Sequence, residues 1–184
     1  MVGPGVDGAG PTTYRVGRAE QGTTVLYKDE GRATEQGYVV KVPVRWSDMD
    51  VFAHINHARM VTLLEEARIP WLFYDSRPTA ELRNGCVVAD LHVQYRAQIR
   101  HDEGPITVTM YVERVRAVDF VVGYEVRPEA ASPTDKPAVT ATTQLVSFDV
   151  DEQRLRRLTA AEREYLESFR RAAGEPENAG RVRR

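Results

Sequence analysis

Residues 38–73 read YVVKVPVRWSDMDVFAHINHARMVTLLEEARIPWLF, and the change of pattern inside this stretch decides the fold class. Residues 38–46 are rich in valine and aromatic side chains with partial alternation, which predicts a strand. From residue 56 on, apolar residues recur at steps of four, three and four: Met60, Leu64, Ala67 and Trp71. That spacing is typical of one helix face, so a strand passes almost directly into a helix.

The predicted helix has a start signal and a stop signal. Asn56 is a good N-cap residue, and Pro70 should end or kink the helix because it has no backbone N–H. Further apolar residues lie beside the main stripe: Val61, Leu63, Ile69, Leu72 and Phe73. The helix is therefore expected to be well buried.

A run of strands follows this helix. Strand patterns occupy residues 87–99, 105–114, 119–127 and 138–149, with hairpin-length connections. Residues 160–172 form a charged helix pattern whose expected buried face is Tyr165, Leu166 and Phe169. The order predicts an α+β fold in which an antiparallel sheet curls around one central helix. The open edges and uncovered face of such a sheet favour self-association.

Composition and charge limit the class of protein. The 184 residues suit one domain with extensions, and a net charge of −2 gives no case for a nucleic-acid partner. A single cysteine, Cys86, rules out an intrachain disulfide and fits a reducing compartment. We find no secretory signal and no membrane-spanning apolar run, so we expect a cytoplasmic protein.

The chain divides into three parts by composition. Residues 1–37 form an N-terminal extension that we expect to be partly disordered, with strand-like runs at 13–16 and 23–27 that could pair as a hairpin. Residues 38–150 form the main domain. Residues 151–184 supply a C-terminal helix and a polar tail.

Polar residues suited to chemistry gather where the strand gives way to the helix. Asp50, His54, Asn56 and His57 fall within eight residues, and Asp48 precedes them. Carboxylates and imidazoles at a helix entrance can perform acid–base or nucleophilic chemistry on a ligand held by backbone amides. The sequence therefore predicts the functional site at this junction.

The pattern Asp48-x-Asp50-x3-His54-Ile55-Asn56-His57, followed by Glu65-Glu66-Ala67-Arg68, resembles the hot-dog fold acyl-CoA thioesterases of the 4-hydroxybenzoyl-CoA thioesterase type. Val93-Gln94-Tyr95-Arg96-Ala97-x-Ile99 is similar to the strand after the helix in that family. The resemblance covers about residues 38–150. Two residues depart from the pattern of the fatty acyl thioesterase branch of this family. His57 stands where a second asparagine is common, and Met60 stands where an aromatic residue often follows. These departures bear on the identity of the substrate more than on the reaction.

The resemblance places the catalytic carboxylate at Asp50. Thioester hydrolysis needs a nucleophile or activated water and a stabiliser for the oxyanion, but hardly a general acid, because a thiol of pKa about 8.5 leaves readily as thiolate. Asp50 could attack directly or act as general base. The structural alternative is an Asx turn or a helix-entry cap. For Asp48 we favour an ion pair with Arg45 or a turn contact.

The other candidates have equally plain alternatives. His54 could orient the acid or the carbonyl, or be an ordinary loop histidine. Asn56 could bind substrate or water, or only cap the helix. His57 is expected to give its backbone N–H to the oxyanion. The resemblance maps Glu65 onto an assisting carboxylate, whereas pairing with Arg68 or Arg59 is its structural alternative, and Glu66 is a weaker candidate.

Other chemistries fit less well. Asp50, His54 and His57 could bind zinc, but no cysteine lies near and the resemblance implies no metal or other cofactor. Cys86 is expected to be a buried structural thiol. There is no Gly-x-Ser-x-Gly elbow and no Gly-rich phosphate loop.

The expected substrate is an acyl-CoA or an acyl-carrier-protein thioester, whose chain length the sequence leaves open. Arg59 and Arg96 are our candidates for binding the coenzyme A phosphates, among basic residues that include Arg100, Arg114 and Arg116. The resemblance implies a homodimer or homotetramer with sites between protomers. A non-enzymatic acyl-CoA sensor and a hot-dog dehydratase or hydratase are the two alternative functions.

Overall fold

The structure is a computed structural model that describes residues 31–171. It contains one antiparallel sheet and two α-helices, with short 3-10 helices at Trp46–Asp48, Ala80–Asn84 and His101–Glu103. The strands are β1 (Arg32–Thr34), β2 (Gly37–Val42), β3 (Cys86–Tyr95), β4 (Ile106–Val115), β5 (Asp119–Pro128), β6 (Val139–Asp149) and β7 (Arg154–Leu155). The helices are α1 (His57–Leu72) and α2 (Ala160–Glu167). The predicted α+β class is confirmed.

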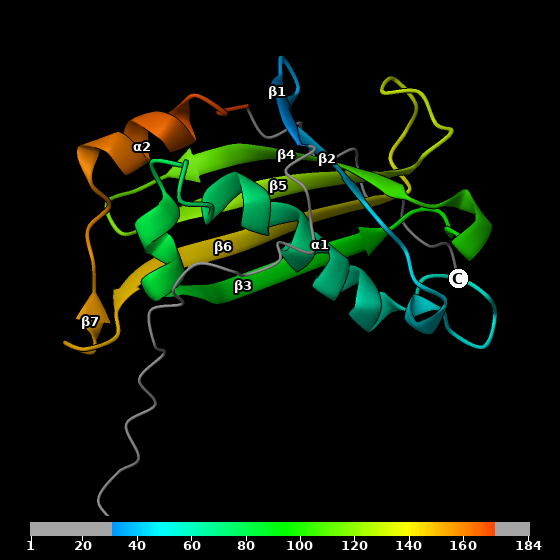
Figure 1. Ribbon diagram of the computed structural model, residues 1–184, viewed down its shortest axis with the longest axis horizontal. Coiled ribbons are helices and arrows are strands. Elements are labelled where there is room, and N and C mark those ends of the chain that lie inside the picture. The colour runs from blue at the N-terminus through cyan, green and yellow to red at the C-terminus, as the bar shows by residue number, and fades with distance from the viewer. Residues whose placement is uncertain (1–30, 172–184) are drawn as a thin grey trace, which may run out of the picture.

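The sheet order is β1-β2-β4-β5-β6-β3, and β7 pairs with β6. Figure 1 shows α1 lying across one face of this sheet, with β3 along one edge. The helix packs mainly against β2 and β4, which lie toward the opposite edge of the sheet from β3. The inner face of β3, on the side of the sheet that α1 covers, is consequently left largely open.

The core lies between α1 and the inner face of the sheet. The predicted stripe residues Met60, Leu64, Ala67 and Trp71 are all buried. Along β6 every second residue from Val139 to Ser147 is buried, as expected for a strand with one covered face. The alternation of buried and less buried residues along β6 therefore identifies the face of the sheet that α1 covers.

Three elements end at residues other than those that the sequence patterns indicated. β2 ends at Val42 instead of residue 46, because Pro43 cannot donate to the ladder. α1 continues past Pro70 to Leu72. Trp71 and Leu72 are fully buried, and this burial offsets the hydrogen bond that Pro70 cannot make. β3 ends at Tyr95, before the predicted residue 99.

The C-terminal segment also differs from the prediction. α2 ends at Glu167, and the next residues run beside β4, where Phe169 and Arg171 exchange backbone hydrogen bonds with Val112. The predicted buried face is confirmed: Leu166 is buried, and Phe169 packs against Trp71 and Tyr165 with ring centroids 5.2 Å apart in both pairs. α2 is thereby fixed to the end of α1.

Part of the N-terminal extension belongs to the sheet. β1 pairs with β2 in an antiparallel hairpin that the sequence patterns did not reveal. The predicted runs at 13–16 and 23–27 lie outside the described residues. No helix within residues 31–171 is long and apolar enough to cross a membrane.

Candidate active site

The predicted functional junction folds into a narrow turn between the first 3-10 helix and α1. Met49 and Ile55 form an isolated antiparallel bridge, and inside it the backbone N–H of Asp50 donates to the carbonyl of His54 at 2.8 Å. The N–H of Ile55 donates to the carbonyl of Ile99 at 2.9 Å, which ties the turn to the segment after β3. These bonds close the base of the turn and so fix the segment that carries the candidate site residues.

Ala53 occupies the tip of this turn in a left-handed conformation, with φ of 61°. Residues other than glycine avoid this region because the Cβ crowds the backbone. The strain is local to the segment that carries Asp50 and His54, which is where functional constraints commonly maintain strained backbone.

The carboxylate of Asp50 is oriented by backbone amides. Its Oδ1 accepts hydrogen bonds from the N–H groups of Phe52 at 2.8 Å and His54 at 3.2 Å. This is the Asx-turn contact that the structural alternative anticipated. No hydrogen bond within residues 31–171 uses Oδ2, so this oxygen is available to a ligand or to water.

Asp48 has the structural role that we favoured for it. It is 5% exposed, and its Oδ2 accepts from the backbone N–H of Arg45 at 2.8 Å. The Arg45 guanidinium lies 3.9 Å from the same oxygen. The backbone carbonyl of Asp48 accepts from the N–H of Asn56 at 2.8 Å, so this residue joins the two ends of the turn.

Asn56 caps α1. Its side-chain oxygen accepts from the N–H of Ala58 at 2.9 Å, and its carbonyl accepts the first helical bond, from Met60. His57 is the first helical residue, and its N–H has no hydrogen-bond partner among the described residues. An unpaired amide at a helix N-terminus, where the helix dipole is positive, is well suited to an anionic oxygen.

Tyr95, near the end of β3, joins the sheet to the helix start. Its hydroxyl donates to the backbone carbonyl of His57 at 2.9 Å. Partial burial raises the pKa of Tyr95, so the hydroxyl stays protonated and remains a donor at neutral pH. Sequence reasoning missed the contact between Tyr95 and the helix start. Its only sign in the sequence is that Tyr95 belongs to the segment 93–99, which is similar to a strand of the thioesterase family.

Asp50, His54, His57 and Tyr95 line a cavity of about 180 Å³. Its wall is formed by Asp50, Phe52, His54, Ile55, His57, Met60, Tyr95, Ala97, Gln98, Ile99 and Val139. Three of the predicted site residues therefore come together: Asp50, His54 and His57. Asn56 lies directly behind them as the helix cap.

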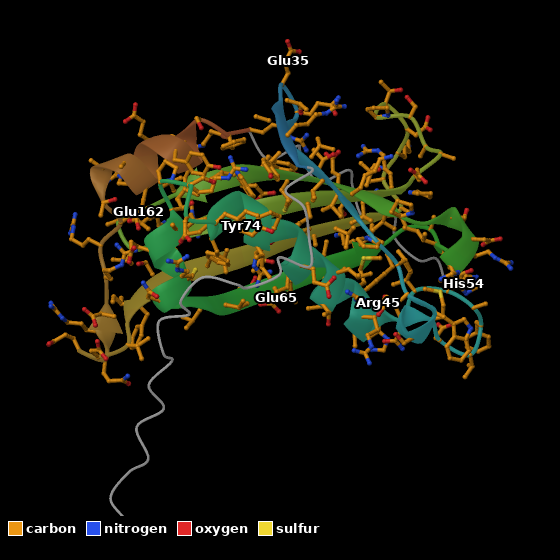
Figure 2. All side chains as sticks on the ribbon, in the orientation of Figure 1. Glu35, Arg45, His54, Glu65, Tyr74 and Glu162 are labelled. Carbon is orange, nitrogen blue, oxygen red and sulfur yellow. The ribbon has the colours of Figure 1, made fainter. Side chains whose placement is uncertain are left out.

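The other predicted residues lie outside this cavity. Glu65 is two turns further along α1, with its side chain 60% exposed and 3.2 Å from the guanidinium of Arg68. Figure 2 shows Glu65 on the helix, well apart from His54. Arg59 is exposed on the first turn of α1, and Arg96, also exposed, directly follows the wall residue Tyr95.

No group of three His, Cys, Asp or Glu side chains within residues 31–171 is arranged to hold a metal ion. Cys86 is half-buried at the start of β3. Burial raises the pKa of its thiol to about 11, which outweighs the opposing effect of Arg68. A thiol of this kind is a poor nucleophile at neutral pH, in line with the structural role predicted for it.

Several solved structures with the same fold are described as thioesterases. Escherichia coli YbaW, a probable thioesterase, is 24% identical, and the match covers 72% of this chain and 98% of that one with a TM-score of 0.60. A Thermus thermophilus thioesterase complexed with coenzyme A and Zn is 22% identical, covering 74% and 96% with a TM-score of 0.61. The DHNA-CoA thioesterase of Staphylococcus aureus is 24% identical, covering 71% and 87% with a TM-score of 0.57.

At these identities the structural matches show a shared fold, and the hot-dog prediction is confirmed. None of the curated protein sequences matches the chain. A family model does match, and it spans residues 44–173, which include the turn, α1 and strands β3 to β7. The chain belongs to the thioesterase-like superfamily.

Proposed function

We propose that this protein hydrolyses an acyl-CoA thioester to the free acid and the thiol, with Asp50 as the principal carboxylate. The observation that supports this proposal is that Asp50 and His57 line the same cavity and that the N–H of His57, at the start of α1, is unpaired among the described residues. A carboxylate and an oxyanion donor in one cavity are the two parts that thioester hydrolysis needs.

Two routes fit this arrangement. In the first, an Asp50 oxygen attacks the thioester carbon, the carbon–sulfur bond breaks, and the thiolate leaves. The resulting mixed anhydride is then hydrolysed by water. In the second, Asp50 takes a proton from a water molecule while the water oxygen attacks the same carbon, and collapse of the tetrahedral intermediate breaks the carbon–sulfur bond and releases the thiolate. The backbone amides of Phe52 and His54 hold Oδ1 in either route, and Oδ2 does the chemistry.

The developing oxyanion would lie at the N-terminus of α1. The N–H of His57 supplies the donor, and the helix dipole adds to the stabilisation. Tyr95 contributes indirectly, because its bond to the His57 carbonyl fixes the first turn of the helix. We assign the His54 imidazole to orienting the thioester carbonyl and the Asn56 amide N–H₂ to binding water or substrate.

The remaining assignments concern the ligand's outer parts. Arg59 and Arg96 flank the cavity and would bind the coenzyme A phosphates, or acidic groups on a carrier protein. Coenzyme A is bound to the Thermus thermophilus relative. Glu65 would reach the acyl part from α1 when it turns away from Arg68, since the Glu65 side chain is 60% exposed.

We propose further that the site is completed in a homodimer, or a homotetramer built from such dimers. β3 is an edge strand of ten residues, and no strand within residues 31–171 pairs with its outer side. Large apolar side chains are exposed on it and on the segment from the first 3-10 helix to the Asp50 turn: Val87, Val88, Leu91, Tyr95, Trp46, Val51 and Phe52. Pairing of two β3 strands about a two-fold axis would cover them and bring the second protomer to the cavity.

Thiol release from a panel of acyl-CoA and acyl-carrier-protein thioesters tests the proposal. Wild type should hydrolyse at least one member, and Asp50→Asn should lower kcat by roughly 100- to 10,000-fold while the substrate still binds. Asp48→Asn is the matched control, because that carboxylate is buried in a turn contact outside the cavity. Glu65→Gln should have a smaller effect, of about tenfold.

Other outcomes would indicate a different mechanism or a different function. Full activity in Asp50→Asn would show that the mechanism is wrong. Binding without turnover by wild type favours an acyl-CoA sensor, and addition of water to an enoyl thioester favours a hydratase. Metal analysis of the active protein, with activity measured after chelation, addresses a zinc enzyme.

A further inference from the structure

A second polar cluster lies inside the fold, between α1 and the sheet, and the hydrolytic mechanism does not use it. At its centre is Arg68, an arginine that is 6% exposed. Its Nη2 lies 3.2 Å from Glu65, but its Nε is buried and has no hydrogen-bond partner among the described residues. A buried guanidinium donor without an acceptor is costly, so this position calls for a ligand or water.

The sheet contributes two more buried hydroxyls to this region. Tyr124 on β5 and Thr143 on β6 are at most 1% exposed, and neither hydroxyl makes a hydrogen bond of normal geometry within residues 31–171. Burial raises the pKa of Tyr124, and the charge of Arg68 together with close polar contacts to Thr143 and Arg68 opposes that shift. All three groups can donate a hydrogen bond, and one of them carries a positive charge.

The cluster lies further along α1 from the cavity that Asp50 lines, so an acyl chain reaching from one to the other would follow a path beside the helix. Residues 57, 61, 65 and 68 follow one another at helical spacing, so His57, Glu65 and Arg68 share one face of α1. Arg68 comes eleven residues after His57, which places it about 16 Å along the helix. The inner face of β3 is open beside this path, where Val88 is 50% and Leu91 38% exposed.

From this arrangement we infer that the protein prefers acyl groups that carry a carboxylate at the end remote from the thioester. Arg68, Tyr124 and Thr143 would bind that carboxylate. The inference rests on the proposed function, since it assumes that the thioester carbonyl lies at His57. An extended acyl chain advances about 1.25 Å per carbon–carbon bond, so a chain of about thirteen to fourteen carbons spans the distance.

A carboxylate suits the cluster better than a methyl group does. It has two oxygens that accept several hydrogen bonds, which matches a guanidinium Nε–H and two hydroxyls. Glu65 is mostly exposed and can turn to solvent when the substrate carboxylate takes its place beside Arg68. A terminal methyl group would leave the buried Nε–H of Arg68 without an acceptor.

The test compares matched pairs of acyl-CoA substrates, with and without a terminal carboxylate, at chain lengths from about eight to fourteen carbons. The quantity measured is the ratio of the two kcat/KM values, which does not depend on the fraction of folded enzyme. Wild type should favour the carboxylate in at least one pair. Arg68→Met should lower the ratio roughly 10- to 100-fold, and Tyr124→Phe and Thr143→Val should each lower it less.

Arg127→Met is the matched control. Arg127 is also 6% exposed, but it is bonded to Glu125 and to the carbonyl of Asp135, and it lines a separate cavity beside β1 and β4. Its loss should leave the ratio unchanged. Affinities of the non-hydrolysable thioether analogues, measured by calorimetry on the same variants, give the same ratio even if the protein proves not to hydrolyse thioesters.

The possible results separate the two proposals. A preference for the unsubstituted chain, a preference for a terminal hydroxyl over a carboxylate, or a ratio that Arg68→Met leaves unchanged would overturn the inference. The cluster would then be satisfied by internal water or a different ligand. Loss of turnover with the carboxylate preference kept in the thioether affinities would instead overturn only the proposed function.

Discussion

The hydroxyl of Tyr95 donates a hydrogen bond to the carbonyl of His57, 38 residues earlier in the chain. This bond joins the end of the edge strand β3 to the first residue of α1. A second bond of the same kind lies near the other end of this helix, where the Tyr165 hydroxyl donates to the carbonyl of Trp71 at 3.1 Å. The two ends of α1 are thus held by tyrosines from different elements.

Tyr95→Phe should lower kcat/KM by up to about tenfold, because a hydrogen bond worth about 1 kcal/mol no longer fixes the helix start beside the cavity. Tyr165→Phe removes the equivalent bond far from the cavity and should lower the melting temperature without lowering kcat/KM. Steady-state kinetics and thermal melts on both variants provide the comparison. Equal kinetic losses in the two would mean that only the stability of α1 matters.

Replacement of Asn56 should separate its cap from its amide. Asn56→Ala loses the bond to the N–H of Ala58 and should cost about 1 kcal/mol of unfolding free energy. Asn56→Asp keeps the cap and should remain as stable as wild type, yet it replaces the amide N–H₂ with a second negative charge near Asp50. We expect this variant to lose at least about tenfold in kcat. Wild-type turnover in Asn56→Asp would limit Asn56 to a structural role.

Ala53→Gly should stabilise the protein. The left-handed backbone at this position is strained for alanine and free of strain for glycine, and the gain, reduced by the larger entropy of glycine in the unfolded chain, should be about 0.5–1 kcal/mol. Ala58→Gly is the control of opposite sign, because Ala58 lies in the regular first turn of α1. Urea unfolding followed by circular dichroism measures both, and a destabilised Ala53→Gly would contradict the strain argument.

The Arg156–Glu162 pair should make stability depend on pH. Burial opposes ionisation of Glu162, but hydrogen bonds from Arg156 and from the backbone N–H of Thr159 outweigh it and lower the pKa of the carboxyl. The lowered folded-state pKa means that its contribution is present above the unfolded value of about 4.3 and is lost as the pH falls through the folded value. Glu162→Gln should therefore be less stable than wild type near pH 7.

The measurement is the unfolding free energy of both proteins in urea between about pH 3 and pH 7. The difference should shrink towards the acid end, where the wild-type carboxyl is also neutral. Glu167→Gln is a suitable control, since that carboxylate forms an exposed pair with Arg170. A difference that stays constant with pH would contradict the assignment.

The sequence predicted the helix and the grouping of the candidate residues Asp50, His54 and His57 for local reasons. The spacing of Met60, Leu64, Ala67 and Trp71 depends only on helical periodicity, and the structure buries all four. The Asp50–His57 segment is also local, because its turn and cap use bonds between near neighbours. Patterns of this range can be read from one sequence.

What the sequence could not reveal depends on pairing between distant strands. Whether β3 or another strand lies at the edge follows from its pairing with β6, which no local pattern specifies. The contact of Tyr95 with His57 follows from the same pairing. Arg68 looked like a partner for Glu65 on the surface, and only the packed sheet shows that its Nε is buried. The three-residue strand β1 has too little apolar pattern to be recognised.

The turn that carries Asp50 and His54 is closed at its base by the bridge between Met49 and Ile55 and by the bond from Asn56 to Asp48. Substitutions between these anchors change the reactive side chains without changing the strand before them or the helix after them. Loop segments with fixed ends accept new sequence more readily than core elements do. This fold can thus acquire a different chemistry through a few point changes at one turn, while its folding information stays in α1 and the sheet.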